Sequence, residues 1–284
     1  MNGLQFLGSI EIGLIYALVA LGVYITFRII DFPDLTVDGS FTTGAAVAAA
    51  MIISGYNSIF ATIMAMLAGS IAGLITGYLN VRWNIIGLLA GIITMTALYS
   101  VNLRIMEKPN IAIMNDVTVF NYGSVVIVTL IIVGCLTIIL ARFFASKLGL
   151  AILASGINPR VSKAYGINVN HMKLIALAMS NGLIALSGAL FAESQGFADV
   201  SMGSGTIIAG LASVIVGEAI MLQPKKIYLC LFACIIGSII YRIVIAFALN
   251  AIDLGLEASD LNLITAIIVA ITMILSKLRQ VNNC

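Results

Sequence analysis

The stretch IIDFPDLTVDGSFTTG, Ile29–Gly44, decides how the rest of the chain is interpreted. It places three aspartates, a proline and two glycines between apolar runs, in a chain that is 61% hydrophobic and only 9% charged. Carboxylates are costly in an apolar environment, and irregular backbone persists there only where protein or water satisfies its polar groups. The stretch is therefore predicted to be a backbone break between two apolar helices.

The composition indicates that lipid surrounds most of the protein. A soluble domain of 284 residues needs a charged surface, and 14 basic with 12 acidic residues cannot supply one. The net charge of +2 says nothing about nucleic acid, and no basic patch suggests it, so no nucleic-acid partner is expected. The fold class expected is therefore all-α and integral to a bilayer.

Apolar runs long enough to cross a bilayer, or nearly so, recur along the chain. A bilayer core needs about twenty apolar residues per helix, so the second and last runs are short. Together these runs predict nine crossings. The runs are Leu4–Ile30, Phe41–Ser54, Ile59–Leu79, Ile85–Met106, Ser124–Phe144, Leu174–Glu193, Thr206–Leu222, Ile227–Leu249 and Leu263–Leu275.

The distribution of cations predicts the orientation. Cytoplasmic loops hold most Lys and Arg residues. With the amino terminus outside and the carboxyl terminus inside, eleven of the fourteen cations fall on the cytoplasmic side. This bias requires that the short run Phe41–Ser54 crosses the membrane, because a re-entrant run would reverse every later helix.

The largest polar insertion on the predicted cytoplasmic side is Ser146–Lys173. Within it, Asn158 is a helix cap, Pro159 suits the first helical position, and Gly166 suits the left-handed residue after the helix. The pattern predicts a helix over Pro159–Tyr165, with Arg160 and Lys163 on one face. A helix of this length is unstable alone in water, so it docks either on another protein or on anionic lipid headgroups.

This loop, GLAILASGINPRVSKAYGINV from Gly149 to Val169, resembles the cytoplasmic loop of permease subunits of bacterial ABC importers. The family is the one that serves branched-chain amino acids, ribose and nucleosides. The resemblance implies that the loop contains a coupling helix, which sits in a cleft of a separate ATPase subunit. It departs from the family pattern at Leu153, where a basic residue is usual. The implied ATPase-coupling residues are Asn158, Pro159, Arg160, Lys163, Tyr165 and Gly166.

The resemblance extends over nearly the whole chain, through FPDLTVDGSF, GIITMTALYSVNLRIMEKPN and SQGFADVSMGSGTIIAGLASVIVGE. These stretches are similar to the permeases that accompany binding lipoproteins for amino acids, including tryptophan and tyrosine. The resemblance implies a dimeric permease in the bacterial cytoplasmic membrane, fed by an external binding lipoprotein. ATP and magnesium would then bind the partner ATPase, and this chain would hold no cofactor or metal and carry no catalytic residue.

The opening motif has a second copy. Phe32-Pro-Asp34-Leu-Thr-Val matches Phe197-Ala-Asp199-Val-Ser-Met at two identical and three conservative positions. An odd number of crossings separates the copies, which predicts an inverted repeat. The chain then forms one transmembrane domain, 1–284. Its parts are a first repeat (1–106), an outer loop with a linking helix (107–145), the coupling loop (146–173) and the second repeat (174–278).

Paired interruptions in two inverted halves point to the substrate path of a transporter. Asp34 and Asp199 are expected near its inner and outer mouths, with Phe32 and Phe197 as apolar plugs. Ser40 and Thr42 are expected to accept hydrogen bonds from the inner helix, and Ser204 and Thr206 from the outer one. The alternative is that both copies are ordinary interfacial loops. The predicted path and gate residues are Phe32, Asp34, Thr36, Asp38, Thr96, Tyr99, Phe197, Asp199 and Ser204.

Three further interpretations stay open at this stage. The cluster Thr94, Thr96, Tyr99, Ser100 and Asn102, and also Glu218, either lines the path or forms hydrogen bonds within the helices. Arg242 either extends to the interface or pairs with Glu193 or Glu11. Lastly, an inverted repeat also fits an ion- or proton-coupled secondary transporter, although no ionisable residue is predicted near the membrane midplane to bind the coupling ion.

Overall fold

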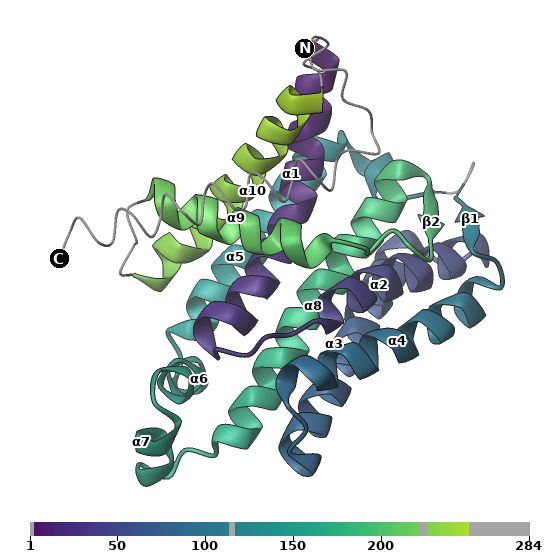
Figure 1. The fold of residues 1–284 in the computed structure, drawn as a ribbon. Coiled ribbons are helices and arrows are strands. Elements are labelled where there is room, and N and C mark those ends of the chain that lie inside the picture. Colours follow the sequence, from purple (N-terminus) through teal and green to yellow (C-terminus); the bar gives the residue numbers. More distant parts are fainter. Residues whose placement is uncertain (1–2, 114–116, 222–225, 250–284) are drawn as a thin grey trace.

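The computed structural model describes residues 3–113, 117–221 and 226–249 (Figure 1). This part of the chain is a helical bundle with one two-stranded ribbon. The helices are α1 (Gly3–Val23, continued by a π-helical turn, Tyr24–Ile29), α2 (Thr36–Ile53), α3 (Ser58–Trp83), α4 (Gly87–Met106), α5 (Val125–Phe144), α6 (Lys147–Ile157), α7 (Pro159–Ala164), α8 (Val169–Gln195), α9 (Thr206–Ile220) and α10 (Ile227–Leu249), with a 3₁₀ turn at Val119–Tyr122. The strands are β1 (Asn110–Ala112) and β2 (Phe197–Asp199), which pair antiparallel.

Seven helical segments in the described residues are long and apolar enough to cross a membrane. They correspond to seven of the nine predicted runs, and the doubtful run Phe41–Ser54 is part of the 18-residue helix α2. Most of the predicted run Thr206–Leu222 forms α9, whose 15 residues are fewer than a bilayer crossing needs. The predicted run Leu263–Leu275 lies outside the described residues. The nine-span count therefore remains a prediction.

Helix α8 lies at the centre of the bundle, and the helices that pack on it approach through small residues. A Cβ atom added at Gly44 of α2 would lie 1.9 Å from the carbonyl oxygen of Ala185, and one at Gly188 would lie 1.9 Å from that of Phe41. Without a hydrophobic force between helices in lipid, such close backbone contact is a main source of their association. The two glycines are therefore required by packing, not by backbone conformation.

The packing of the first three helices is repeated by the last three described ones. Helix α3 packs along α8, and α10 packs along α1; likewise α2 packs on α8 as α9 packs on α1. Serine hydroxyls join α1 to both α10 and α8: Ser238 of α10 donates to the carbonyl of Gly13 at 2.7 Å, and Ser180 of α8 donates to that of Gly22 at 2.7 Å. Within each half, α2 packs on α3 and α9 packs on α10.

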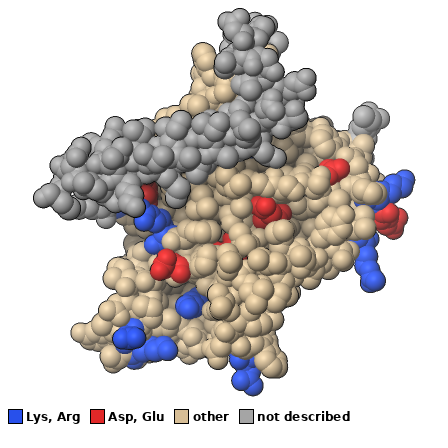
Figure 2. Space-filling view, viewed as in Figure 1, with Lys and Arg blue, Asp and Glu red and all other residues tan. Residues whose placement is uncertain are grey.

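One end of the bundle, here called the α7 end, gathers the ends of α1, α3 and α5 with α6, α7 and the start of α8. Helix α6 contacts the end of α1, where Gly156 meets Ile29. The end of α3 contacts the start of α8, where Gly77 meets Leu174. A basic residue lies in the last turn of α1 with its π-helical extension, of α3 and of α5; these are Arg28, Arg82 and Arg142. Figure 2 shows several blue side chains at the lower left and bottom of the molecule, where this end lies, and another group at the right edge.

Glu193 and Arg242 do not pair, so one of the alternatives left open for Arg242, a partner in Glu193, is wrong. Glu193 instead accepts hydrogen bonds from Thr62 Oγ1 at 2.8 Å and from the amide of Val119 at 2.7 Å. The guanidinium carbon of Arg242 lies 3.7 Å from the centre of the Tyr16 ring. A cation over an aromatic face is stabilised by the ring quadrupole, which is a partner that sequence spacing did not indicate.

Candidate functional site

The first interrupted segment, residues 30–35, carries a fully buried carboxylate. Asp34 is 0% exposed. Its Oδ1 accepts the amide of Thr36, the first residue of α2, at 2.8 Å, and its Oδ2 accepts Asn181 Nδ2 at 2.7 Å. Because Asn181 is near the middle of α8, Asp34 lies deeper in the bundle than the mouth predicted for it. The predicted backbone break is present, and α8 supplies the partner that makes it tolerable.

The surroundings of Asp34 form a small polar network between helices. Asn181 Oδ1 accepts the hydroxyl of Ser40 at 2.6 Å, and the hydroxyls of Thr36 and Thr76 lie 2.7 Å apart. Sequence reasoning missed Asn181 and Thr76. The signal for Asn181 was its amide in the middle of a long apolar run, since polar side chains there usually bond across helices. Phe32, at 4% exposure, packs its ring against Gly87 at the start of α4.

The second interrupted segment, residues 196–205, repeats the local geometry of the first. Asp199 Oδ1 accepts the amide of Ser201 at 2.7 Å, two residues on, as Asp34 does with Thr36. Hydrogen bonds from the Ser201 hydroxyl and amide, and from Asn110 of β1, hold the pKa of Asp199 below its usual value. Unlike Asp34, Asp199 is partly exposed, and its neighbour Phe197 is 38% exposed. The two aspartates share a turn but not an environment.

The second segment meets the start of α2 through Asp38, in the first turn of that helix. Its carboxylate accepts the amide of Gly205 at 3.0 Å, the hydroxyl of Thr206 at 2.8 Å and the amide of Ile207 at 2.9 Å. The first amides of a helix have no partner within the helix, so Asp38 caps α9 from the other half of the chain.

The capping roles predicted for Ser40, Thr42 and Thr206 are therefore wrong. The hydroxyls of Ser40, Thr42 and Thr206 instead donate to Asn181, to the carbonyl of Asp38 and to the carboxylate of Asp38. A carboxylate accepts more strongly than a hydroxyl and carries the charge that a helix amino terminus favours, so Asp38 takes this place. Nothing in the local sequence showed that Asp38 lies beside a residue 167 positions later.

The close approach of the second segment to α2 depends on Gly203. A Cβ atom there would lie 2.1 Å from the carbonyl oxygen of Asp38, so any larger residue would separate the segments. The amide of Gly203 also donates to Thr42 Oγ1 at 3.1 Å. The first turns of α2 and the start of α9 are thus joined by backbone contact as well as by the Asp38 carboxylate.

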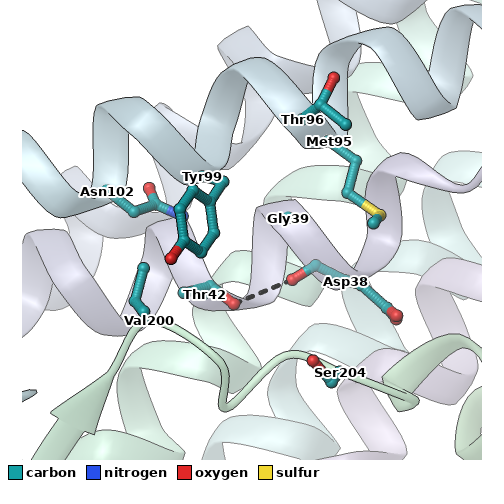
Figure 3. Close-up of a pocket in the computed structure, with 9 residues that line it drawn as sticks. All are labelled: Asp38, Gly39, Thr42, Met95, Thr96, Tyr99, Asn102, Val200 and Ser204. Atoms are coloured by element: carbon teal, nitrogen blue, oxygen red, sulfur yellow. Dashed lines mark hydrogen bonds between the residues drawn. The ribbon is translucent and has the colours of Figure 1, made fainter. Parts of the chain in front are cut away.

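A cavity of about 280 Å³ opens beside this junction (Figure 3). Four of the predicted path residues line it, and the other five do not. It lies between the first turns of α2, one face of α4 and the segment that precedes α9. The lining residues are Asp38, Gly39, Thr42, Met95, Thr96, Tyr99, Asn102, Val200 and Ser204.

Some side chains of the predicted α4 cluster already form hydrogen bonds within their own helix, so they are not available to a ligand in the cavity. The hydroxyls of Thr94 and Thr96 donate back to carbonyls of their own helix, at 3.0 Å to Ala90 and at 3.0 Å to Ile92. Tyr99 is exposed, whereas Asn102 is 1% exposed. Glu218 does not line the cavity; it forms a two-bond ion pair with Arg28, at 2.8 and 2.6 Å, where α9 ends beside α1.

The loop predicted to couple to an ATPase has the expected local structure. Asn158 Oδ1 accepts the amides of Arg160 and Val161, both at 3.1 Å, and Pro159 occupies the first turn. Gly166 has a φ of +80°, in the left-handed region. The helix ends at Ala164, one residue before the predicted end, and leaves Arg160, Lys163 and Tyr165 exposed.

A bundle of membrane-crossing helices, with two interrupted segments beside a cavity and a capped helix projecting at one end, defines the class of a multi-pass membrane transport protein. Residues 6–276 match the family described as "Branched-chain amino acid transport system / permease component". The chain belongs to this family and is the permease component of an ABC transport system. This membership overturns the alternative of an ion- or proton-coupled secondary transporter.

Two relatives and one solved structure are similar to the chain. The "Tyrosine transport system permease protein" of Clostridioides difficile (strain R20291) is 44% identical over 258 residues, 90% of this chain and 86% of the relative. "Uncharacterized protein RP368" of Rickettsia prowazekii (strain Madrid E) is 35% identical, over 93% and 95% of the two chains. The structure titled "PsaBC from Streptococcus pneumoniae in complex with Fab" matches with a TM-score of 0.56 and 16% identity, over 94% of this chain and 90% of that one, which supports the fold alone.

Proposed function

We propose that the chain is the membrane subunit of a bacterial ABC importer for an amino acid of the tyrosine type. Two copies form the path in the cytoplasmic membrane, and an extracytoplasmic binding lipoprotein delivers the solute. A separate ATPase subunit binds ATP and magnesium, so this chain hydrolyses nothing and holds no cofactor. The name of the relative that is 44% identical supports the amino-acid substrate.

The observation that carries the proposal is the surface of α7. Ile157 and Tyr165 flank this helix and are 85% and 82% exposed, and Arg160 and Lys163 lie on it. Exposed large apolar side chains beside cations are typical of a protein contact rather than of a solvated loop. A helix of six residues is not stable by itself, so a docked partner accounts for its exposed side chains.

The contacts behind α7 supply a route from this surface to the interrupted segments. A Cβ atom added at Gly156 of α6 would lie 1.7 Å from the carbonyl oxygen of Ile29, so α6 rests directly on the end of α1. Residues 30–35 follow at once and lead into α2. Arg28, in the same turn, is paired with Glu218 at the end of α9. A movement of α6 and α7 would therefore reach both interrupted helices.

The inverted repeat and the orientation are part of the same proposal. The repeated packing of α8 on α3 and of α1 on α10 supports the repeat, as does the shared turn at Asp34 and Asp199. Basic residues at the ends of α1, α3 and α5 support a cytoplasmic α7 end, with the amino terminus outside. The transport path would then open alternately to the two sides of the membrane. It would be flanked by Phe32, Asp34 and Phe197.

Thiol labelling of intact cells tests the orientation. In a variant whose only cysteine is the native Cys284, which lies outside the described residues, an impermeant reagent is expected to react only after the cells are opened. With Asn2→Cys as the only cysteine, reaction is expected in intact cells, because the bias of cations places the amino terminus outside. The reverse pattern would contradict the orientation.

Charge reversal on α7 tests the docking of an ATPase. In the purified complex, Arg160→Glu is expected to lower transport and the ATP hydrolysis stimulated by the binding protein together, by about tenfold, since a lost and repelled charge contact is worth roughly 1–3 kcal/mol. The matched control is Arg104→Glu, an exposed arginine at the opposite end of the bundle. Equal loss in both variants, or normal activity in Arg160→Glu, would refute a docking role for α7.

A further inference from the structure

The cavity beside Asp38 has two polar ends and an apolar middle. Helices α2 and α4 run parallel, since Phe32, Leu35 and Gly39 face Gly87, Gly91 and Met95 in turn. Asn102 therefore lies seven residues, or about 10 Å, beyond the level of Asp38 and Gly39 along α4. Figure 3 shows Asn102 and Asp38 at opposite sides of the cavity, with Tyr99 between them.

The Asn102 end has an unused hydrogen-bonding group. Asn102 is 1% exposed, and within the described part of the chain its Oδ1 accepts no hydrogen bond. Buried amide oxygens nearly always have partners, so this unpaired one in a cavity wall points to a missing ligand group. Rotation of the amide by half a turn presents either its oxygen or its NH₂ group, so it can pair with a hydroxyl in both senses.

The Asp38 end is negative. Asp38 is the one charged residue among the nine that line the cavity, all of which lie in the described ranges. Its three hydrogen bonds come from neutral donors in and before α9. A carboxylate has about four lone-pair sites, so one remains for a further donor. An ammonium group supplies both that donor and the missing positive charge, and the hydroxyl of Ser204, between Gly203 and Gly205, adds a donor for a ligand carboxylate nearby.

The wall between the two ends suits an aromatic ring. Tyr99 and Met95 from α4 and Val200 from the facing segment provide it. Aromatic rings stack on tyrosine, and thioethers contact ring edges favourably. A volume of about 280 Å³ is at the lower limit of ligand pockets, which span roughly 300–1,000 Å³, so the cavity suits a molecule of amino-acid size.

We propose that this cavity is a binding site, within one permease subunit, for an aromatic amino acid with a polar tip. The ammonium group lies against Asp38, the ring lies along Tyr99 and Met95, and Asn102 pairs with the ring hydroxyl. The permease then selects its solute in addition to the binding protein. This inference rests on the proposed function, because it names the ligand of the same path.

Protection of an introduced cysteine tests the site without transport. The permease complex, reconstituted in lipid without binding protein, carries Thr96→Cys as its only reactive cysteine, in the cavity wall. Tyrosine is expected to slow maleimide labelling with a half-maximal concentration at least about ten times lower than phenylalanine needs, because a site built to pair a hydroxyl disfavours the analogue that lacks it. Tyramine, which keeps the ammonium group, is expected to protect the cysteine. The analogue 4-hydroxyphenylpropionate, which has no ammonium group, is expected to leave it unprotected.

A variant pair completes the test. Asn102→Leu is expected to abolish the preference for tyrosine over phenylalanine, and Ser100→Ala, an exposed position on the same helix, is expected to keep it. Equal protection by tyrosine and phenylalanine in the parent protein would overturn the proposal, and this comparison needs no Asn102 variant. If the complete complex imports tyrosine but no ligand protects the cysteine, the site is wrong and the proposed function stands. If the complex imports no amino acid from any binding protein, the proposed function itself fails.

Discussion

Replacing Gly156 with alanine is expected to disconnect the α7 end from the interrupted helices. The added Cβ atom would lie 1.7 Å from the carbonyl oxygen of Ile29 and 3.2 Å from the Cα atom of Ile30. Both are backbone atoms, so no side-chain rotation relieves the contact, and α6 must move away from the end of α1. Overpacking of this kind costs about 1–3 kcal/mol. Transport is expected to fall by at least about tenfold, while ATP hydrolysis loses its response to the loaded binding protein.

The matched control is Gly134→Ala in α5. Gly134 is also a helical glycine, but a Cβ atom there meets nothing within 4 Å. Alanine favours a helix over glycine, so this variant is expected to be as active as the parent and slightly more stable. The measurement is solute uptake and ATPase stimulation in the same proteoliposomes. Full activity of Gly156→Ala would show that the contact between α6 and α1 does not transmit the movement.

Replacing Asp38 with alanine is expected to destabilise the junction of the two halves. Two backbone amides at the start of α9 and the hydroxyl of Thr206 lose their acceptor. Losing a cap costs about 0.5–2 kcal/mol, and hydrogen bonds to a charged group contribute roughly 1.5–3 kcal/mol each. We expect a loss of about 2–4 kcal/mol in unfolding free energy, measured by thermal unfolding in lipid nanodiscs.

Asp199→Ala is the control for this prediction. Asp199 caps its own turn through the amide of Ser201, as Asp34 does, but it is partly exposed and joins no other helix. Water can replace the lost acceptor there, so a change of less than about 1 kcal/mol is expected. Equal destabilisation by the two variants would mean that Asp38 matters only within α2 and does not hold α9.

The local chemistry of short segments was predictable from the sequence alone. Asn158 caps α7, Pro159 starts it and Gly166 follows it in the left-handed conformation, because each property belongs to a residue and its neighbours. The breaks before α2 and α9 were predictable in the same way, from Pro, Gly and Asp within apolar runs. The repeated motif also indicated that Asp34 and Asp199 hold equivalent places in the two halves, and in the structure each accepts the amide two residues further on.

The contacts between segments were not predictable in that way. Asp38 was placed on the path, but its role as the cap of α9 depends on a residue 167 positions away. Asn181 was missed, and neither of the alternatives left open for Arg242, extension to the interface or a carboxylate partner, named the ring of Tyr16 over which it lies. A polar side chain in a membrane needs a partner, and the sequence shows the need without showing which of several helices supplies it.

The sequence by itself determined the class of protein, the positions of most helices and the two interruptions, because lipid imposes hydrophobic length and because proline, glycine and aspartate act locally. The tertiary structure alone decided which interruption meets which helix, where the cavity lies, and that Gly156 and Gly203 are contact points. These depend on how closely backbones approach, a distance set by packing across more than a hundred residues of chain, which no local pattern records.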